Sequence, residues 1–193
     1  MTNIIFFGPP GAGKGTQAKI LSSFLKLPHL STGDILRSKI KLQDSLALKV
    51  KEIIASGKLV PDEILNEIVS DKLIKDCNQG FILDGYPRTL EQGIFLDNFL
   101  ETNDLKIDFI FDIFLEYKIL EKRIINRSKE ENREDDNKNI LMTRFEEYKL
   151  TTQKITEHYE IKYRNKYFKI DGNNEISKIT SEIKKIIGNT WFS

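Results

Sequence analysis

Cysteine and histidine are nearly absent from this chain of 193 residues, which has one cysteine and two histidines. A single thiol, Cys77, excludes an internal disulfide and a cysteine-rich zinc site. His29 and His158 are isolated, without metal-ligand spacing, and we expect structural or surface roles for both. The apolar start "NIIFF" is too short for a signal peptide or a membrane span. We therefore expect a cytoplasmic protein with no structural zinc and no membrane partner.

Net charge is also nearly lacking, at +1 from 30 basic and 29 acidic side chains. Such a chain has no overall field that would attract a nucleic acid, so anions must bind locally. Arginine is scarce too, because 23 of the 30 basic residues are lysine. Arginine is the better bidentate ligand for phosphate and carboxylate, so each of the few arginines needs a reason. They are Arg37, Arg88, Arg123, Arg127, Arg133, Arg144 and Arg164.

Apolar runs that alternate with helical periodicity predict a single α/β domain, since the chain is too short for two ordinary domains. Buried strands are expected at Asn3–Phe7, Leu27–Ser31, Gly80–Asp84, Ile107–Leu115 and Tyr167–Asp171. Helices are expected at Lys14–Leu25, Gly33–Lys41, Asp44–Ser56, Asp62–Asp76, Thr89–Leu100, Glu116–Arg127 and Lys138–Asn165, and after Gly172 as far as Ile187. This alternation predicts a parallel sheet with helices on both faces and ligands at the carboxyl ends of its strands.

The segment "FFGPPGAGKGTQA", from Phe6 to Ala18, has the spacing of a phosphate-binding loop. Gly8, four residues, Gly13 and Lys14 match the pattern G-x-x-x-x-G-K, whose amides surround phosphates while the lysine reaches the β- and γ-phosphates. Composition alone gives roughly 0.07 accidental matches, and the flanking strand and helix supply the required context. The alternative is a glycine-rich turn with a purely structural use.

The residue after the lysine departs from that pattern, because Gly15 stands where serine or threonine is usual and the hydroxyl comes next, at Thr16. Direct metal ligation at this position is therefore in doubt. Asp84 ends an apolar strand and is the acid expected to organise Mg²⁺, through water. The expected cofactor is thus Mg²⁺ bound with a nucleotide.

Further motifs follow the phosphate loop in a set order: "LSTGDILR" (Leu30–Arg37), "GKLVPDE" (Gly57–Glu63), "FILDGYPRTLEQ" (Phe81–Gln92), Arg123 with Arg127, "REDD" (Arg133–Asp136) and Arg144. Together they resemble the adenylate kinases, in the short-lid form, from Gly8 to Arg144. The resemblance implies reversible transfer of the γ-phosphoryl group of ATP·Mg²⁺ to AMP, giving two ADP. It also implies a monomer with a P-loop NTPase-type three-layer sandwich, a five-stranded parallel sheet, a helical AMP-binding insertion at residues 31–60 and a short lid at 127–137.

The resemblance assigns roles residue by residue, and it leaves only Arg164 among the arginines as an ordinary surface residue. The catalytic residues it implies are Lys14, Arg88, Arg123, Arg133 and Arg144. The ATP site it implies comprises Gly11, Ala12, Gly13, Lys14, Gly15, Thr16, Arg123, Arg127 and Asn173. The AMP site it implies comprises Thr32, Gly33, Arg37, Lys58, Leu59, Val60, Gly85, Arg88, Gln92, Arg133 and Arg144.

The accepted monophosphate depends on two positions in this resemblance. Adenylate kinases have a threonine in "STGD" and a glutamine four residues after "DGYPR", and this chain has Thr32 and Gln92 there. The related UMP and CMP kinases tend to have alanine and asparagine. A glutamine can accept from the adenine amino group and donate to a ring nitrogen, so we expect AMP as the acceptor.

Three other functions stay open from the sequence alone. A UMP/CMP kinase shares the loop and the arginines. A P-loop nucleotide switch needs an N-K-x-D guanine motif, and the nearest string, "NKNI" from Asn137, lacks the aspartate. A kinase of a non-nucleotide metabolite leaves "LSTGDILR" and "YPRTLEQ" without a role.

Overall fold

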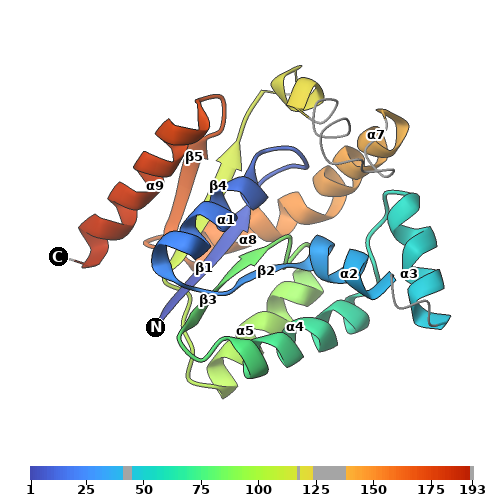
Figure 1. The fold of residues 1–193 in the computed structure, drawn as a ribbon, viewed down its shortest axis with the longest axis horizontal. Coiled ribbons are helices and arrows are strands. Elements are labelled where there is room, and N and C mark those ends of the chain that lie inside the picture. Colours follow the sequence, from blue (N-terminus) through green and yellow to red (C-terminus); the bar gives the residue numbers. More distant parts are fainter. Residues whose placement is uncertain (41–44, 117, 124–137, 192–193) are drawn as a thin grey trace.

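The computed structural model describes residues 1–40, 45–116, 118–123 and 138–191, which form a five-stranded sheet between helices (Figure 1). The strands are β1 (Thr2–Phe7), β2 (His29–Ser31), β3 (Gly80–Asp84), β4 (Phe109–Phe114) and β5 (Tyr167–Asp171). Their order is β2-β3-β1-β4-β5, and every neighbouring pair is parallel. The predicted α/β class and the five parallel strands are confirmed.

The helices follow the expected positions closely. They are α1 (Lys14–Leu25), α2 (Thr32–Ile40), α3 (Ser45–Ala55), α4 (Asp62–Asp76), α5 (Leu90–Thr102), α7 (Lys138–Glu147), α8 (Gln153–Lys162) and α9 (Ile176–Trp191), and residues 118–123 are helical as well. The single long helix predicted at Lys138–Asn165 is wrong in two respects. A π-helical turn, η1 (Tyr148–Thr152), separates α7 from α8, and the helix ends at Lys162.

The core has two halves because the sheet is buried on both faces. Along β1, Ile4 and Phe6 pack with residues of α1 and α9, whereas Ile5 and Phe7 pack with residues of α4, α5 and α8. The ring of Phe7 meets Tyr159 of α8 edge-on at 5.6 Å between centroids. Burial on both faces explains why β1 is a continuous apolar run. The result is three layers, helices, sheet and helices (Figure 1).

Helices α2 and α3 lie outside this layered body. They follow β2, and Figure 1 shows α3 set away from the sheet before the chain returns to it through α4. They fall in the predicted insertion at residues 31–60, and closure of that segment on a substrate stays a prediction. Across the described ranges, no helix is both long and apolar enough to cross a membrane.

Candidate active site

One open cavity of about 1320 Å³ lies at the carboxyl ends of the strands. Residues that end or directly follow three strands line it: Gly8 after β1, Ser31 at the end of β2 and Asp84 at the end of β3. The remaining walls come from α1, α2, residues 57–60, Arg123, the α7 to η1 segment and the start of α9. This is the edge of a parallel α/β sheet at which ligands bind.

The phosphate loop joins β1 to α1 in a conformation that requires glycine. Gly8, Gly11 and Gly13 have φ of 133°, 83° and 96°, a region that other residues rarely adopt. A Cβ on Gly8 would lie 2.4 Å from the carbonyl oxygen of Ile113 in β4, so glycine also lets the loop pass close to the neighbouring strand. The loop shape is therefore a property of the backbone.

Lys14, the first residue of α1, turns back over this loop. Its Nζ donates to the carbonyl oxygens of Gly8 at 2.8 Å and Pro9 at 2.9 Å. The first turn of α1 has no acidic residue, so the positive end of the helix dipole is not neutralised there. An ammonium group and a helix N-terminus thus face the same side of the cavity, which suits a phosphate.

Arg123 lines the cavity and lies against the same loop. Its Nη1 is 3.5 Å from the carbonyl oxygen of Ala12, and its Nη2 is 3.4 Å from that of Asn174. Both distances are long for hydrogen bonds, so these contacts hold the guanidinium only weakly. A ligand phosphate at the loop would offer it a stronger acceptor.

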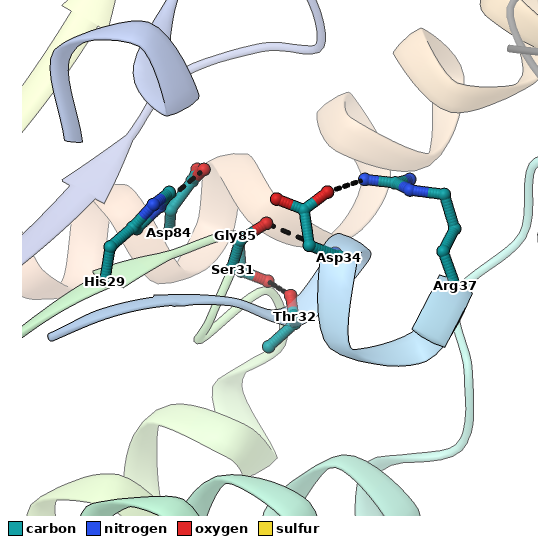
Figure 2. Close-up of polar contacts among 7 residues, drawn as sticks. All are labelled: His29, Ser31, Thr32, Asp34, Arg37, Asp84 and Gly85. Carbon is teal, nitrogen blue, oxygen red and sulfur yellow. Dashed lines mark hydrogen bonds and ion pairs between the residues drawn. The ribbon is translucent and has the colours of Figure 1, made fainter. Parts of the chain in front are cut away.

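Asp84 supplies a carboxylate beside the loop (Figure 2). Nε2 of His29 lies 3.4 Å from its Oδ2, and a Cβ on Gly15 would lie 3.2 Å from the same oxygen. Burial alone would raise the pKa of Asp84, but His29 and the charge of Lys14 hold that pKa below its usual value. The group therefore stays ionised, and carboxylate oxygens are the ligands that Mg²⁺ prefers. In the sequence His29 looks isolated. In the structure it lies beside Asp84, because β2 pairs with β3.

Three arginines gather at another part of the cavity wall, namely Arg37, Arg88 and Arg144. Burial lowers the pKa of the Arg88 guanidinium, and the positive charges of Arg144 and Arg37 lower it further. Arg37 is held by Asp34 at 2.5 Å between Nη2 and Oδ1 (Figure 2). A cluster of like charges in a partly buried wall is relieved by a bound anion.

Gly85, directly after β3, brings two of the predicted site residues together. Its carbonyl oxygen accepts from Oγ1 of Thr32 at 2.9 Å and from Nε of Arg88 at 2.7 Å. A Cβ at this position would lie 2.8 Å from Nη2 of Arg88, and φ is 80°. Glycine thus allows a threonine on α2 and an arginine after β3 to converge on one carbonyl oxygen; Figure 2 shows the contact between Thr32 and Gly85.

Most of the predicted site residues within the described ranges do line this cavity. They are Gly11, Ala12, Gly13, Lys14, Gly15, Thr16, Thr32, Gly33, Arg37, Lys58, Leu59, Val60, Asp84, Gly85, Arg88, Arg123 and Arg144. Arg127, Arg133 and the predicted lid at 127–137 lie outside the described residues. Asn173 is not part of the lining; its Oδ1 accepts from the backbone N–H of Glu116 at 3.2 Å, while its neighbour Asn174 does line the cavity.

Gln92 is also absent from the lining, and it is fully buried behind it. Its Oε1 accepts from the backbone N–H of Arg88 at 2.7 Å, and its Nε2 donates to Oδ1 of Asp62 at 2.6 Å. The residue is thus bonded to the arginine segment of the wall. Its contact with a base stays a prediction.

Several lining residues were not foreseen, among them Glu147, Tyr148 and Thr152. Arg144, Tyr148 and Thr152 follow one another at intervals of four, which places them along one side of a helix. Because Arg144 was already assigned to the site, this spacing could have identified Tyr148 and Thr152 from the sequence. Thr180 of α9 also lines the cavity. Its sequence segment resembles an ordinary surface helix, so no sequence signal indicated it.

Comparison with known proteins decides the family. The family model described as adenylate kinase matches residues 6–164. The chain belongs to the adenylate kinase family. It is 42% identical to the adenylate kinase of Rhizobium meliloti (strain 1021), over 95% of this chain and 98% of that protein. It is 39% identical to the adenylate kinase of Thermotoga maritima (strain ATCC 43589 / DSM 3109 / JCM 10099 / NBRC 100826 / MSB8), over 97% of this chain and 98% of the relative.

Membership of the adenylate kinase family makes the chain an enzyme, a phosphotransferase that acts on nucleotides. The two alignments differ in length, spanning 191 positions for the Rhizobium protein and 217 for the Thermotoga protein. The second span exceeds the 193 residues of this chain, so the Thermotoga relative has residues without a counterpart here. The Rhizobium alignment does not exceed that length.

Proposed function

We propose that this adenylate kinase transfers the γ-phosphoryl group of ATP·Mg²⁺ reversibly to AMP, giving two ADP, with the cavity at the strand ends as its active site. The observation that carries the proposal is the set of residues that line this one cavity. The phosphate loop with Lys14 and the group Arg37, Arg88 and Arg144 face the same space. A donor phosphate and an acceptor phosphate therefore have separate cationic sites within reach of each other.

The donor side is the phosphate loop. Backbone amides of Gly11–Thr16 and the N-terminus of α1 would surround the phosphates of ATP, with Lys14 on the β- and γ-phosphates. Arg123 is weakly held by two carbonyl oxygens and so is available to move onto the phosphate in transfer. Arg127 and Asn173 belong to this side through the resemblance to the family.

The acceptor side is the wall formed by α2, residues 57–60 and the turn after β3. Arg37 and Arg88 would bind the AMP phosphate, and Arg144, with Arg133, would bind the group in transfer. Both Arg88 and Thr32 are anchored on Gly85, which fixes the guanidinium before substrate arrives. Thr32, Gly33, Lys58, Leu59, Val60, Gly85 and Gln92 would line or support the base pocket.

The chemistry needs charge stabilisation and no general base. The transition state of phosphoryl transfer is loose, with negative charge spread over the equatorial oxygens, so positioned cations supply most of the catalysis. The attacking group is a phosphate, whose second pKa of about 6 leaves it mostly ionised at neutral pH. Closure of residues 31–60 and 127–137 would exclude water, which otherwise competes as acceptor.

Magnesium fits beside the donor side. Asp84 is ionised, largely buried and close to Gly15 of the loop, so its oxygens can bind water molecules of a hydrated Mg²⁺. When bound with ATP, the ion neutralises charge on the β- and γ-phosphates. The chain's own part is to supply that carboxylate at the end of β3, with the His29 side chain 3.4 Å away.

The proposal includes a monomeric, cytoplasmic enzyme, as the family resemblance implies. The test of the reaction is a phosphorus NMR time course with ATP·Mg²⁺ and AMP, CMP or UMP as the acceptor. Rapid and reversible formation of ADP with AMP supports the proposal. Transfer only to CMP or UMP would preserve the phosphate sites and overturn the assignment of the acceptor. No transfer to any of the three would overturn the proposed reaction.

A further inference from the structure

Asp62, the first residue of α4, joins two residues that lie far along the chain. Its Oδ1 accepts from Nε2 of Gln92 at 2.6 Å, and its Oδ2 accepts from Oγ1 of Thr89 at 2.8 Å. Thr89 is the N-cap of α5 and accepts from the backbone N–H of Gln92 at 3.1 Å. A single carboxylate therefore holds both the start of α5 and the amide that follows it.

These contacts leave the Gln92 amide only one orientation. Oε1 accepts from the backbone N–H of Arg88, and Nε2 donates to a carboxylate. A flipped amide would place an N–H group against the N–H of Arg88 and an oxygen against Asp62. A glutamine amide has two N–H donors and two acceptor lone pairs. The two contacts use one of each, so one N–H of Nε2 and one lone pair of Oε1 remain.

We propose that Asp62 is a positioning residue that sets the base selectivity of the enzyme through Gln92. The inference rests on the proposed contact of Gln92 with the AMP base. Both carboxylate oxygens of Asp62 accept hydrogen bonds, so Asp62 keeps Nε2 on its own side and fixes where Oε1 lies. The amide then presents an acceptor and a donor to an edge that has an amino group beside a ring nitrogen acceptor, as adenine has.

The matching probe is IMP, whose hypoxanthine base has nearly the shape of adenine but the opposite polarity on that edge. It offers a carbonyl acceptor and a ring N–H donor, so the amide orientation set by Asp62 opposes it. Selectivity of this kind is measured as the ratio of kcat/KM for AMP to kcat/KM for IMP. Loss of the orientation should lower this ratio without removing the phosphate sites.

The experiment compares Asp62→Ala, Gln92→Ala and the double variant. We expect Gln92→Ala to lower the AMP/IMP ratio about tenfold or more, and Asp62→Ala to lower it several-fold. The change for Asp62→Ala should come from KM for AMP, with KM for ATP unchanged. The double variant should be no less selective than Gln92→Ala alone, because Asp62 acts through the amide.

Two controls separate positioning from stability. Thr89→Val removes the other partner of Asp62 and the cap of α5, so it should lower Tm but leave the ratio in place. Glu67→Ala removes an exposed carboxylate five residues further along α4 and should change neither. If Asp62→Ala does not fold, the nearly isosteric Asp62→Asn replaces it, with a smaller loss of the same sign expected.

The outcomes distinguish this inference from the function on which it rests. A normal ratio in Asp62→Ala together with a lowered ratio in Gln92→Ala would overturn the role of Asp62 alone. The role of Asp62 would also be overturned if Asp62→Ala lowered the ratio further in the Gln92→Ala background. A normal ratio in Gln92→Ala would overturn the contact of Gln92 with the base, and the role of Asp62 with it.

Discussion

The phosphate loop and the Gln92 segment, to which we assign the donor phosphates and the acceptor base, are built in different ways. Lys14 is held by carbonyl oxygens only six and five residues earlier in the chain. Gln92 is held by Asp62, 30 residues away, and Arg88 shares its carbonyl partner with Thr32, 53 residues from Gly85. The bonds that hold Lys14 over the loop are thus local, whereas those that hold the Gln92 amide and Thr32 join segments distant in the sequence.

This contrast predicts different consequences of mutation. Changes in the loop should remove catalysis or strain the backbone. Changes around Gln92 should instead alter which base is accepted, because we assign the phosphates and the base to different residues. The following experiments test the contrast.

The largest expected effect is that of Lys14→Ala. We expect kcat to fall at least about a thousandfold, since the ammonium group faces the charge that develops in transfer. Circular dichroism should show the native fold. Lys72→Ala, an exposed lysine of α4 that pairs with Asp76, is the control and should keep full activity. A Lys14→Ala enzyme with normal kcat would remove the loop from the active site.

Arg88→Ala tests the acceptor side. Loss of the guanidinium that we assign to the acceptor phosphate should lower kcat/KM by about 100 to 1000-fold, or about 3 to 4 kcal/mol, with the fold retained. The backbone N–H of Arg88 still holds Gln92 in this variant. Arg164→Ala, at an exposed arginine outside the site, should behave as the unchanged enzyme. Near-normal activity of Arg88→Ala with a native Tm would contradict its role.

Gly8→Ala should act on stability. Its Cβ would lie 2.4 Å from the backbone of Ile113, at a φ of 133° that alanine rarely adopts. We expect the free energy of unfolding to fall by more than about 2 kcal/mol in urea titrations. Gly188→Ala is the matched control, because nothing lies within 4 Å of its Cβ. In α9 that change should be neutral or stabilise by up to about 1 kcal/mol. Equal free energies of unfolding for Gly8→Ala and Gly188→Ala would contradict the expected strain in the loop.

Gln92→Ala should relax the choice of acceptor base. Removing the amide should lower the preference for AMP over CMP about tenfold, chiefly through KM for AMP, while kcat changes little. Steady-state kinetics with both monophosphates measures this. A preference that does not change would place base selection elsewhere in the cavity.

The smallest effect concerns pH. The folded pKa of Asp84 lies below its unfolded value, so its ionised form stabilises the fold above the unfolded pKa of about 3.9. That contribution is lost as the pH falls through the folded pKa. Asp84→Asn should therefore be less stable than the unchanged protein at pH 7, and the gap should shrink below about pH 4. A gap independent of pH, measured by urea unfolding, would contradict the charged state.

Sequence patterns predicted the parts of the molecule that are encoded locally. The inner strands β1, β3 and β4 are recognisable because burial on both faces makes them largely continuous apolar runs, and the loop because its glycines have a fixed spacing. The partner of His29 was not predictable, since it depends on β2 lying beside β3. The bond between Asp62 and Gln92 escaped for the same reason, because it joins the starts of α4 and α5.

The π-helical turn η1 has a consequence for how the continuous helical segment of α7, η1 and α8 tolerates changes in length. Such a turn holds one residue more than an α-helical turn, which shifts the angular phase of everything before it by about 100°. Arg144 can therefore face the cavity while Ile155 and Tyr159 face the core. Deleting one residue within Tyr148–Thr152 would restore a regular helix and, with α8 anchored in the core, rotate Arg144 out of the cavity. The chain would still have Arg144, but its side chain would no longer face the cavity.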